Sequence, residues 1–213
     1  KAVPDPENLA YSSLPLPPHQ DLLYYESPPG LQLLHCITFD EMEGGETFFI
    51  DGFNAADILR KNNPEAFKTL TKVPMTFSNF RTEYKLKYRR HIIQLDDLEN
   101  VTGVNISPPW EGALVADSED VGKFYESYRE FMTILEDPQN RYMRKLKPGE
   151  LVVFNNRRLL HGREGFGADA GHREFEGAYV SLDDFSNRFH NLKEIFDDKD
   201  EAVLKRLGNN SVF

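Results

Sequence analysis

Short apolar runs separated by turn residues are the feature that most limits how this chain can fold. The run LQLLHCITF (31–39) is followed by an acidic turn, DEMEGGE (40–46), and then by a second apolar run, TFFID (47–51). Apolar runs of roughly four to eight residues bounded by glycine are typical of strands that are buried on at least one face. The pattern therefore predicts that the two runs form an antiparallel pair within one sheet.

The segment before the first run cannot form a regular helix. Seven of the 13 prolines fall within the first 30 residues, and several of them are adjacent. Proline removes a backbone donor and restricts the preceding residue to extended conformations. We therefore expect residues 1–30 to be extended and irregular.

Helical patterns interrupt the strands. NAADILRKNNPEAFKTLTKV predicts two short helices, with Ala55, Ile58 and Leu59 on one face and Pro64 starting the second. SEDVGKFYESYREFMTILED (118–137) is the clearest helix, with Ser118 as its N-cap. Its apolar positions keep the helical period and are Val121, Phe124, Tyr125, Tyr128, Phe131, Met132 and Leu135.

Strand patterns return on both sides of these helices. They are predicted at 73–80, 86–95, 101–107, at the buried strand LVVFNN (151–156) and at REFEGAYVSL, before a final helix at about 183–196. No internal repeat and no domain boundary is visible. The sequence therefore predicts one domain, 1–213, that is mainly β with flanking helices and a helical insert.

Composition and charge exclude several classes of protein. The net charge of −10 argues against nucleic-acid binding, and the one basic cluster, KLKYRRH (85–91), alternates like the wet face of a strand. No apolar run is long enough to cross a membrane, and the N-terminus has no secretory signal. The single cysteine, Cys36, excludes an internal disulfide and favours a reducing, cytoplasmic setting. A mitochondrial location is the alternative, because a transit peptide would lie upstream of residue 1.

Two histidines at predicted strand ends are candidate metal ligands. His19 and Asp21 share a face of an extended strand, and His161 closes the apolar stretch LVVFNNRRLLH. Two imidazoles and one carboxylate on one face of an octahedron form the facial triad that holds Fe(II). His-x-Asp is also common by chance, so His19 and His161 could equally be satisfied polar residues at strand ends.

Longer stretches of the sequence support the metal site. They are NLAY (8–11), HQD (19–21), PPGLQLLHC (28–36), DGFNAAD (51–57), KNNPEAF (61–67), LKPGELVVFNNRRLLHGRE (146–164) and EGAY (176–179). Together they resemble the Fe(II)/2-oxoglutarate dioxygenases related to taurine dioxygenase, in the branch that hydroxylates γ-butyrobetaine and trimethyllysine. The resemblance implies a double-stranded β-helix (jelly-roll) core, Fe(II) and 2-oxoglutarate as requirements, and ascorbate as reductant.

The resemblance also assigns roles to residues of this chain. His19, Asp21 and His161 match the iron ligands, and Arg173 matches the arginine that binds the distal carboxylate of 2-oxoglutarate. The other matched positions are Leu34 and Asn8 in the cosubstrate pocket, and Tyr11 and Tyr179 in an aromatic cage for a trimethylammonium group.

The implied reaction is hydroxylation of γ-butyrobetaine to L-carnitine, with trimethyllysine or another quaternary amine as the alternative. Relatives imply a homodimer, and they carry a zinc-binding N-terminal domain that would lie before residue 1. The stretch NISPPWEG (105–112) departs from the family and leaves contacts to the substrate carboxylate open.

Three rival interpretations remain. A zinc hydrolase would use similar ligands, but no His-Glu-x-x-His helix occurs. GFGADAG (165–171) lacks the spacing and preceding strand of a nucleotide site. A catalytically inactive binding module on the dioxygenase fold is the third.

Overall fold

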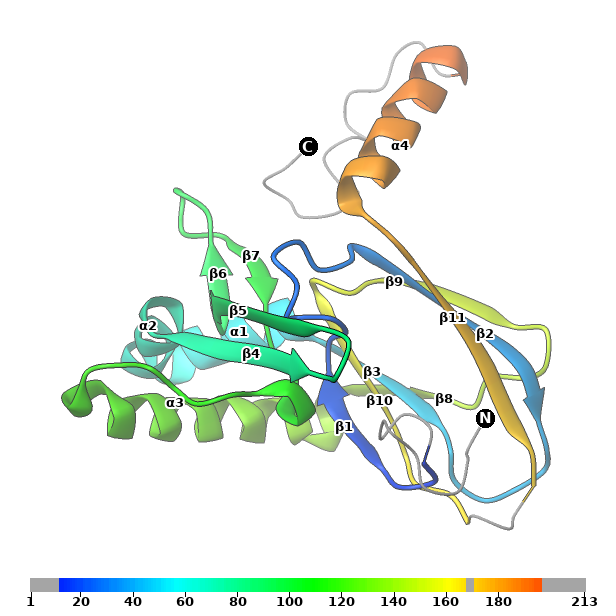
Figure 1. The fold of residues 1–213 in the computed structure, drawn as a ribbon, viewed down its shortest axis with the longest axis horizontal. Coiled ribbons are helices and arrows are strands. Elements are labelled where there is room, and N and C mark those ends of the chain that lie inside the picture. The colour runs from blue at the N-terminus through cyan, green and yellow to red at the C-terminus, as the bar shows by residue number, and fades with distance from the viewer. Residues whose placement is uncertain (1–11, 168–170, 197–213) are drawn as a thin grey trace.

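Two antiparallel sheets face one another in the computed structural model, which describes residues 12–167 and 171–196 (Figure 1). The first sheet has the strand order β1-β10-β3-β8, and the second has the order β11-β2-β9. The strands of the first are β1 (Leu16–His19), β10 (Leu159–Arg163), β3 (Thr47–Asp51) and β8 (Arg141–Arg144). Those of the second are β11 (Arg173–Val180), β2 (Leu31–Phe39) and β9 (Leu151–Asn155).

The predicted pairing of the two apolar runs is wrong. β2 pairs with β11 and β9, whereas β3 pairs with β10 and β8 in the other sheet. The linker between them contains Gly44 and Gly45, both at positive φ, and a Cβ on Gly44 would lie 2.1 Å from the carbonyl oxygen of Gly165. This linker crosses from one sheet to the other, because it is too long for a tight hairpin and packs against the chain after β10.

Strands that follow one another along the chain mostly change sheets. β1, β3 and β10 belong to the first sheet, and β2, β9 and β11 alternate with them in the second. This alternation is the double-stranded β-helix that the family resemblance implies, with a helical insert between β3 and β8.

The insert forms a block beside the two sheets (Figure 1). Its elements are α1 (Gly52–Asn62), α2 (Pro64–Lys72), β4 (Pro74–Phe80), β5 (Lys85–His91), β6 (Ile93–Leu95), β7 (Val101–Val104) and α3 (Ser118–Glu136). Asp51 caps α1 by accepting the backbone N–H groups of Phe53 and Asn54. Pro64 is the first residue of α2, as predicted, and Asn63 caps that helix.

Three local predictions need correction. Asp117, not Ser118, occupies the N-cap of α3, and Tyr125 lies outside its buried stripe, with 48% of its surface exposed. β9 is not a buried strand, because Leu151 and Val153 on this edge strand are both about half exposed. The last helix, α4 (Leu182–Phe196), agrees with its predicted range of about 183–196 and projects away from the sheets (Figure 1). None of the described helices is both long and apolar enough to cross a membrane.

The largest cluster of buried apolar side chains belongs mainly to the helical block. It joins residues of α1, α2 and α3 to β4, β6 and β7, and it reaches the first sheet through Phe48, Ile50 and Leu160. No residue of β2, β9 or β11 belongs to this cluster. The second sheet therefore contributes nothing to this cluster, and it contacts the first sheet through separate side chains such as Phe154, whose ring packs on that of Phe49.

Truncation of Phe131 tests this account of the core. Phe131 is completely buried in α3, so Phe131→Ala is expected to lower the free energy of unfolding by about 3–5 kcal/mol. Urea denaturation measures the loss. Tyr125→Ala in the same helix is the matched control and should cost less than about 1 kcal/mol, because Tyr125 is half exposed. Equal losses in the two variants would contradict the assignment of the core.

Candidate metal centre

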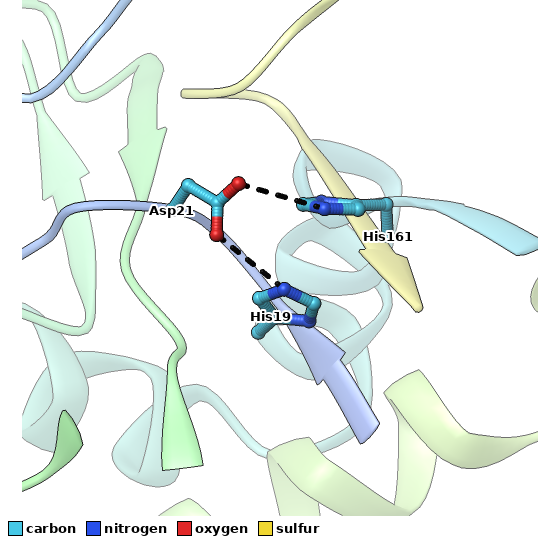
Figure 2. Close-up of side chains that lie close together, drawn as sticks. All are labelled: His19, Asp21 and His161. Carbon is cyan, nitrogen blue, oxygen red and sulfur yellow. Dashed lines mark ion pairs between the residues drawn. The ribbon is translucent and has the colours of Figure 1, made fainter. Parts of the chain in front are cut away.

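His19, Asp21 and His161 converge between the two sheets. Each offers one ligand atom, and these atoms all lie within 4.8 Å of one another. Figure 2 shows the Asp21 carboxylate beside both imidazole rings, with its Oδ1 atom 3.5 Å from His19 Nε2 and its Oδ2 atom 3.8 Å from His161 Nε2. The three side chains predicted as iron ligands therefore form one cluster.

Asp21 and His161 occupy backbone positions that differ from the predicted ones. β1 ends at His19, so Asp21 lies in the turn that follows the strand. His161 is the central residue of β10 rather than its last residue, and it stands directly opposite His19 in the β1–β10 ladder. Directly opposed residues of antiparallel strands place their side chains on the same face, so the two rings come within 4.3 Å between centroids.

The tautomer of His19 is set by a backbone carbonyl. His19 Nδ1 lies 2.9 Å from the carbonyl oxygen of Pro17, which can only accept, so Nδ1 carries the proton and donates it. The lone pair is then on Nε2, the nitrogen that faces Asp21. This hydrogen bond orients the ring in the manner found for metal-binding histidines.

His161 is held in its neutral form by burial. Its ring is 6% exposed and packs against Phe154 and His19. Burial, reinforced by the charge of His19 and opposed by Asp21, lowers the pKa of His161 from 6.5 to about 3. The imidazole is therefore uncharged at neutral pH and keeps a lone pair for a metal ion.

Asp21 is ionised although it is largely enclosed. Burial by itself raises its pKa, but hydrogen bonding to His19, the charges of His161 and His19, and the Tyr179 hydroxyl hold that pKa well below its ordinary value. Tyr179 donates its hydroxyl to Asp21 Oδ2 at 2.6 Å, and Gln32 donates its side-chain amide to the same oxygen at 2.7 Å. The cluster thus combines one carboxylate with the neutral imidazole of His161 and with the imidazole of His19, whose Nε2 atom faces Asp21.

Buried polar side chains hold the turn that carries Asp21. Asn156 is completely buried, accepts the backbone N–H of Asp21 at 3.0 Å, and donates to its carbonyl at 3.1 Å. Gln20, also fully buried, exchanges hydrogen bonds with the backbone of Ile106. Leu22 adopts a φ of +62°, a left-handed conformation that costs a non-glycine residue energy and that the surroundings must enforce.

Arg90 supports the same turn from the insert. Arg90 is the one buried residue of the basic strand β5. The residues before it alternate between exposed and partly buried, as predicted. Its guanidinium donates to the carbonyl oxygens of Leu23 and Tyr25. The insert therefore fixes the segment that follows Asp21.

The triad lines a cavity of about 190 Å³ between the sheets. Its other lining residues include Leu16, Gln32, Leu34, Thr47, Gly162, Arg163, Arg173, Phe175, Gly177 and Tyr179. A Cβ at Gly162 would lie 2.2 Å from the ring of Phe48, so only glycine fits at this position beside His161. A larger groove of about 820 Å³ lies along β8 and β9, but it contains none of the three candidate ligands.

Arg173 lies in the cavity wall as the first residue of β11, where the sequence placed it. Its guanidinium lies 4.0 Å from the ring centroid of Phe175 and donates to the carbonyl of Gly45 at 3.2 Å and the hydroxyl of Thr47 at 3.5 Å. Burial, together with the charge of Arg163, lowers its pKa to about 10, so it remains a cation at neutral pH.

Six of the eight predicted site residues therefore line one cavity: His19, Asp21, Leu34, His161, Arg173 and Tyr179. Asn8 and Tyr11 lie outside the described residues, and their predicted roles stay predictions. Sequence reasoning missed Gln32, Arg163 and Asn156. Gln32 and Arg163 stand two residues from Leu34 and His161 on β2 and β10, so the strand period of two could have identified both.

The buried state of His161 predicts how stability depends on pH. Between pH 6.5 and about 3 the unfolded chain binds a proton at His161 that the folded chain does not bind, so the free energy of unfolding falls as the pH falls through this range. In the metal-free chain, urea denaturation at pH 7 and at about pH 4.5 should show a smaller loss for His161→Gln than for the wild type. Parallel losses in the two proteins would contradict the neutral, buried state of His161.

Comparisons with known proteins point to a family of dioxygenases. The family model described as "Taurine catabolism dioxygenase TauD, TfdA family" matches residues 1–179. A gamma-butyrobetaine dioxygenase of Pseudomonas sp. (strain AK-1) is 34% identical over 184 residues, which are 86% of this chain and 48% of that protein. A trimethyllysine dioxygenase of Meyerozyma guilliermondii is 32% identical over 195 residues, which are 86% of this chain and 46% of that protein.

The fold resembles that of a solved asparagine oxygenase in complex with Fe(II), 2S,3S-3-hydroxyasparagine and succinate. The TM-score is 0.66 at 19% sequence identity, over 85% of this chain and 55% of that one. The chain spans about half the length of the curated relatives that it matches.

Proposed function

Since this chain belongs to the TauD, TfdA family of dioxygenases, we propose that it hydroxylates a trimethylammonium compound with Fe(II), 2-oxoglutarate and O₂. One observation carries the proposal. Two imidazoles and a carboxylate meet in a cavity whose wall also contains the buried Arg163 and the partly buried Arg173. The triad would bind a metal ion, and the two arginines would attract an anionic cosubstrate.

The donor set fits Fe(II). Neutral imidazole nitrogens and one carboxylate are the ligands of the facial triad, and His19, Asp21 and His161 supply them from one side of the cavity. Iron bound by these three residues would supply the activation of O₂, so that one oxygen atom would enter the substrate and the other succinate, with loss of CO₂ from 2-oxoglutarate. The protein contributes the ligand geometry and the exclusion of water.

Arg173 would bind the distal carboxylate of 2-oxoglutarate. A guanidinium donates two parallel hydrogen bonds to a carboxylate, and this one already lies at the cavity wall beside the Thr47 hydroxyl. Leu34 on β2 would pack against the carbon chain of the cosubstrate. Arg163 stays buried next to Arg173 and holds the segment before β1 by donating to the carbonyls of Ser12 and Leu14.

Tyr179 would form a wall of the substrate site. A trimethylammonium group cannot donate a hydrogen bond, so aromatic faces are its natural partners. Tyr179 lines the cavity and is 44% exposed as a residue, so part of it would be open to such a group. The relatives named gamma-butyrobetaine dioxygenase favour γ-butyrobetaine, and the relatives named trimethyllysine dioxygenase make trimethyllysine the runner-up.

A product assay tests the proposal. With Fe(II), ascorbate, 2-oxoglutarate and γ-butyrobetaine we expect equal amounts of succinate and of a product that has gained one oxygen atom, detected by mass spectrometry. Parallel reactions with trimethyllysine and other quaternary amines identify the substrate. Succinate formation that no amine stimulates would contradict the substrate class. Metal binding without any turnover would favour the inactive binding module instead.

A further inference from the structure

The two oxygens of the Asp21 carboxylate have different surroundings. Oδ2 accepts two hydrogen bonds, one from the Gln32 amide at 2.7 Å and one from the Tyr179 hydroxyl at 2.6 Å. Oδ1 has one longer contact, to the Nε2 atom of His19 at 3.5 Å. One oxygen thus accepts two short hydrogen bonds from the protein, and the other faces a residue that is itself a candidate metal ligand.

We propose, on the basis of the iron site put forward above, that Gln32 and Tyr179 are positioning residues that hold Oδ2 and leave Oδ1 as the single oxygen presented to the metal. A carboxylate can bind a metal through one oxygen or both. Two short hydrogen bonds on the same oxygen disfavour binding through both, because the lone pairs of Oδ2 are already used. They also stop rotation of the carboxylate.

The two residues that donate to Oδ2 come from neighbouring strands of the second sheet. Gln32 on β2 and Tyr179 on β11 are directly paired in the antiparallel ladder, so their side chains leave the same face at the same level. Asp21 accepts hydrogen bonds from both members of this pair and lies in a turn that Asn156 holds through the backbone. The position of the carboxylate therefore depends on one rung of the second sheet.

Within the described residues, the side chain of Gln32 makes hydrogen bonds only to candidate metal ligands. It is 2% exposed, and its Oε1 atom has no hydrogen-bond partner among the described residues. Burying an unsatisfied amide oxygen is costly, so a residue selected for stability alone would be apolar here. The amide of Gln32 instead contacts two of the candidate ligands, Asp21 at 2.7 Å and His161 Nε2 at 3.4 Å.

Tyr179 connects the predicted substrate wall to the metal ligand. Its ring lines the cavity, and its hydroxyl is bound to Asp21. The hydrogen bond therefore fixes the orientation of the ring that a trimethylammonium group would contact. Tyr179→Phe separates the two roles, because it keeps the aromatic face and removes only the donor.

Metal binding by two variants tests the proposal. We expect Tyr179→Phe and Gln32→Leu each to bind Mn(II) about 10- to 100-fold more weakly than the wild type, as measured by electron paramagnetic resonance titration. The visible absorption spectrum of the Co(II) form should change in both, because the carboxylate is free to bind through its second oxygen. Gln32→Leu should not lower the thermal unfolding temperature, since it removes a buried unsatisfied oxygen as well as a hydrogen bond.

Surface substitutions of the same chemistry provide the controls. Tyr142→Phe on β8 and Gln139→Leu before β8 change exposed residues outside the cavity, and both should leave Mn(II) affinity and the Co(II) spectrum unaltered. Wild-type affinity and spectra in Tyr179→Phe and Gln32→Leu would overturn the positioning roles and leave the iron site standing. A wild-type chain that binds no Mn(II) or Co(II) would overturn both proposals.

Discussion

His161→Ala is expected to weaken Mn(II) binding by more than about 100-fold and to abolish succinate formation. Removing a residue that only orients a metal ligand commonly costs about 10- to 100-fold in affinity, and loss of a ligand costs more. His161 supplies one of three candidate ligands from the centre of β10, and no other histidine lines the cavity except His19. Isothermal titration with Mn(II) and the succinate assay measure the two effects.

The controls for this experiment separate loss of the ligand from loss of the fold. His190→Ala changes an exposed histidine on α4 and should leave metal binding unaltered. His161→Gln fills more of the buried space than alanine and should bind metal as poorly as His161→Ala. Unchanged Mn(II) affinity in both His161 variants, with normal thermal unfolding, would refute the metal site.

Arg173→Ala is expected to raise the KM for 2-oxoglutarate by about 10²- to 10³-fold without weakening Mn(II) binding. Truncating one partner of a buried, hydrogen-bonded charge pair costs about 2–5 kcal/mol, and each 1.4 kcal/mol is a factor of ten. Arg173 contacts none of the three candidate ligands through a described hydrogen bond, so the metal site should survive its removal.

Arg173→Lys gives the more discriminating result. Lysine retains the charge but lacks the planar fork and cannot make two parallel hydrogen bonds to a carboxylate, so we expect an increase in KM of only about 10-fold. Arg188→Ala on the exposed side of α4 is the control and should leave the KM unaltered. A KM for 2-oxoglutarate that Arg173→Ala does not raise would exclude Arg173 as the carboxylate partner.

The main apolar core and the candidate metal site lie in different parts of the molecule. The main apolar cluster lies in the helical block and includes the fully buried Phe77 and Phe131, whereas the cavity lies between the sheets and is lined by both polar and apolar side chains. The two parts meet at the turn after β1, where Arg90 of the insert holds the carbonyls of Leu23 and Tyr25. Phe131→Ala should therefore change mainly the free energy of unfolding, whereas His161→Ala should change mainly Mn(II) binding.

Local sequence patterns were sufficient for most elements. Both short helices around Pro64, the long helix from Ser118 and the terminal helix lie within one or two residues of their predicted bounds, because caps and periodicity act between near neighbours. The pairing of 31–39 with 47–51 was wrong for the opposite reason. Each segment has a strand pattern, but nothing local in either one specifies which sheet it joins.

The sequence by itself determined which side chains are available to the site. His19 and Asp21 are two residues apart, and resemblance to the family added His161, Arg173, Leu34 and Tyr179, all of which line the cavity. Only the tertiary structure decided how they act on one another. The pairing of β1 with β10 brings the two imidazole rings to 4.3 Å between centroids, and the pairing of β2 with β11 places Gln32 and Tyr179 against one oxygen of Asp21. Strand register is a long-range property, since it depends on contacts between segments more than 100 residues apart, and no local pattern encodes it.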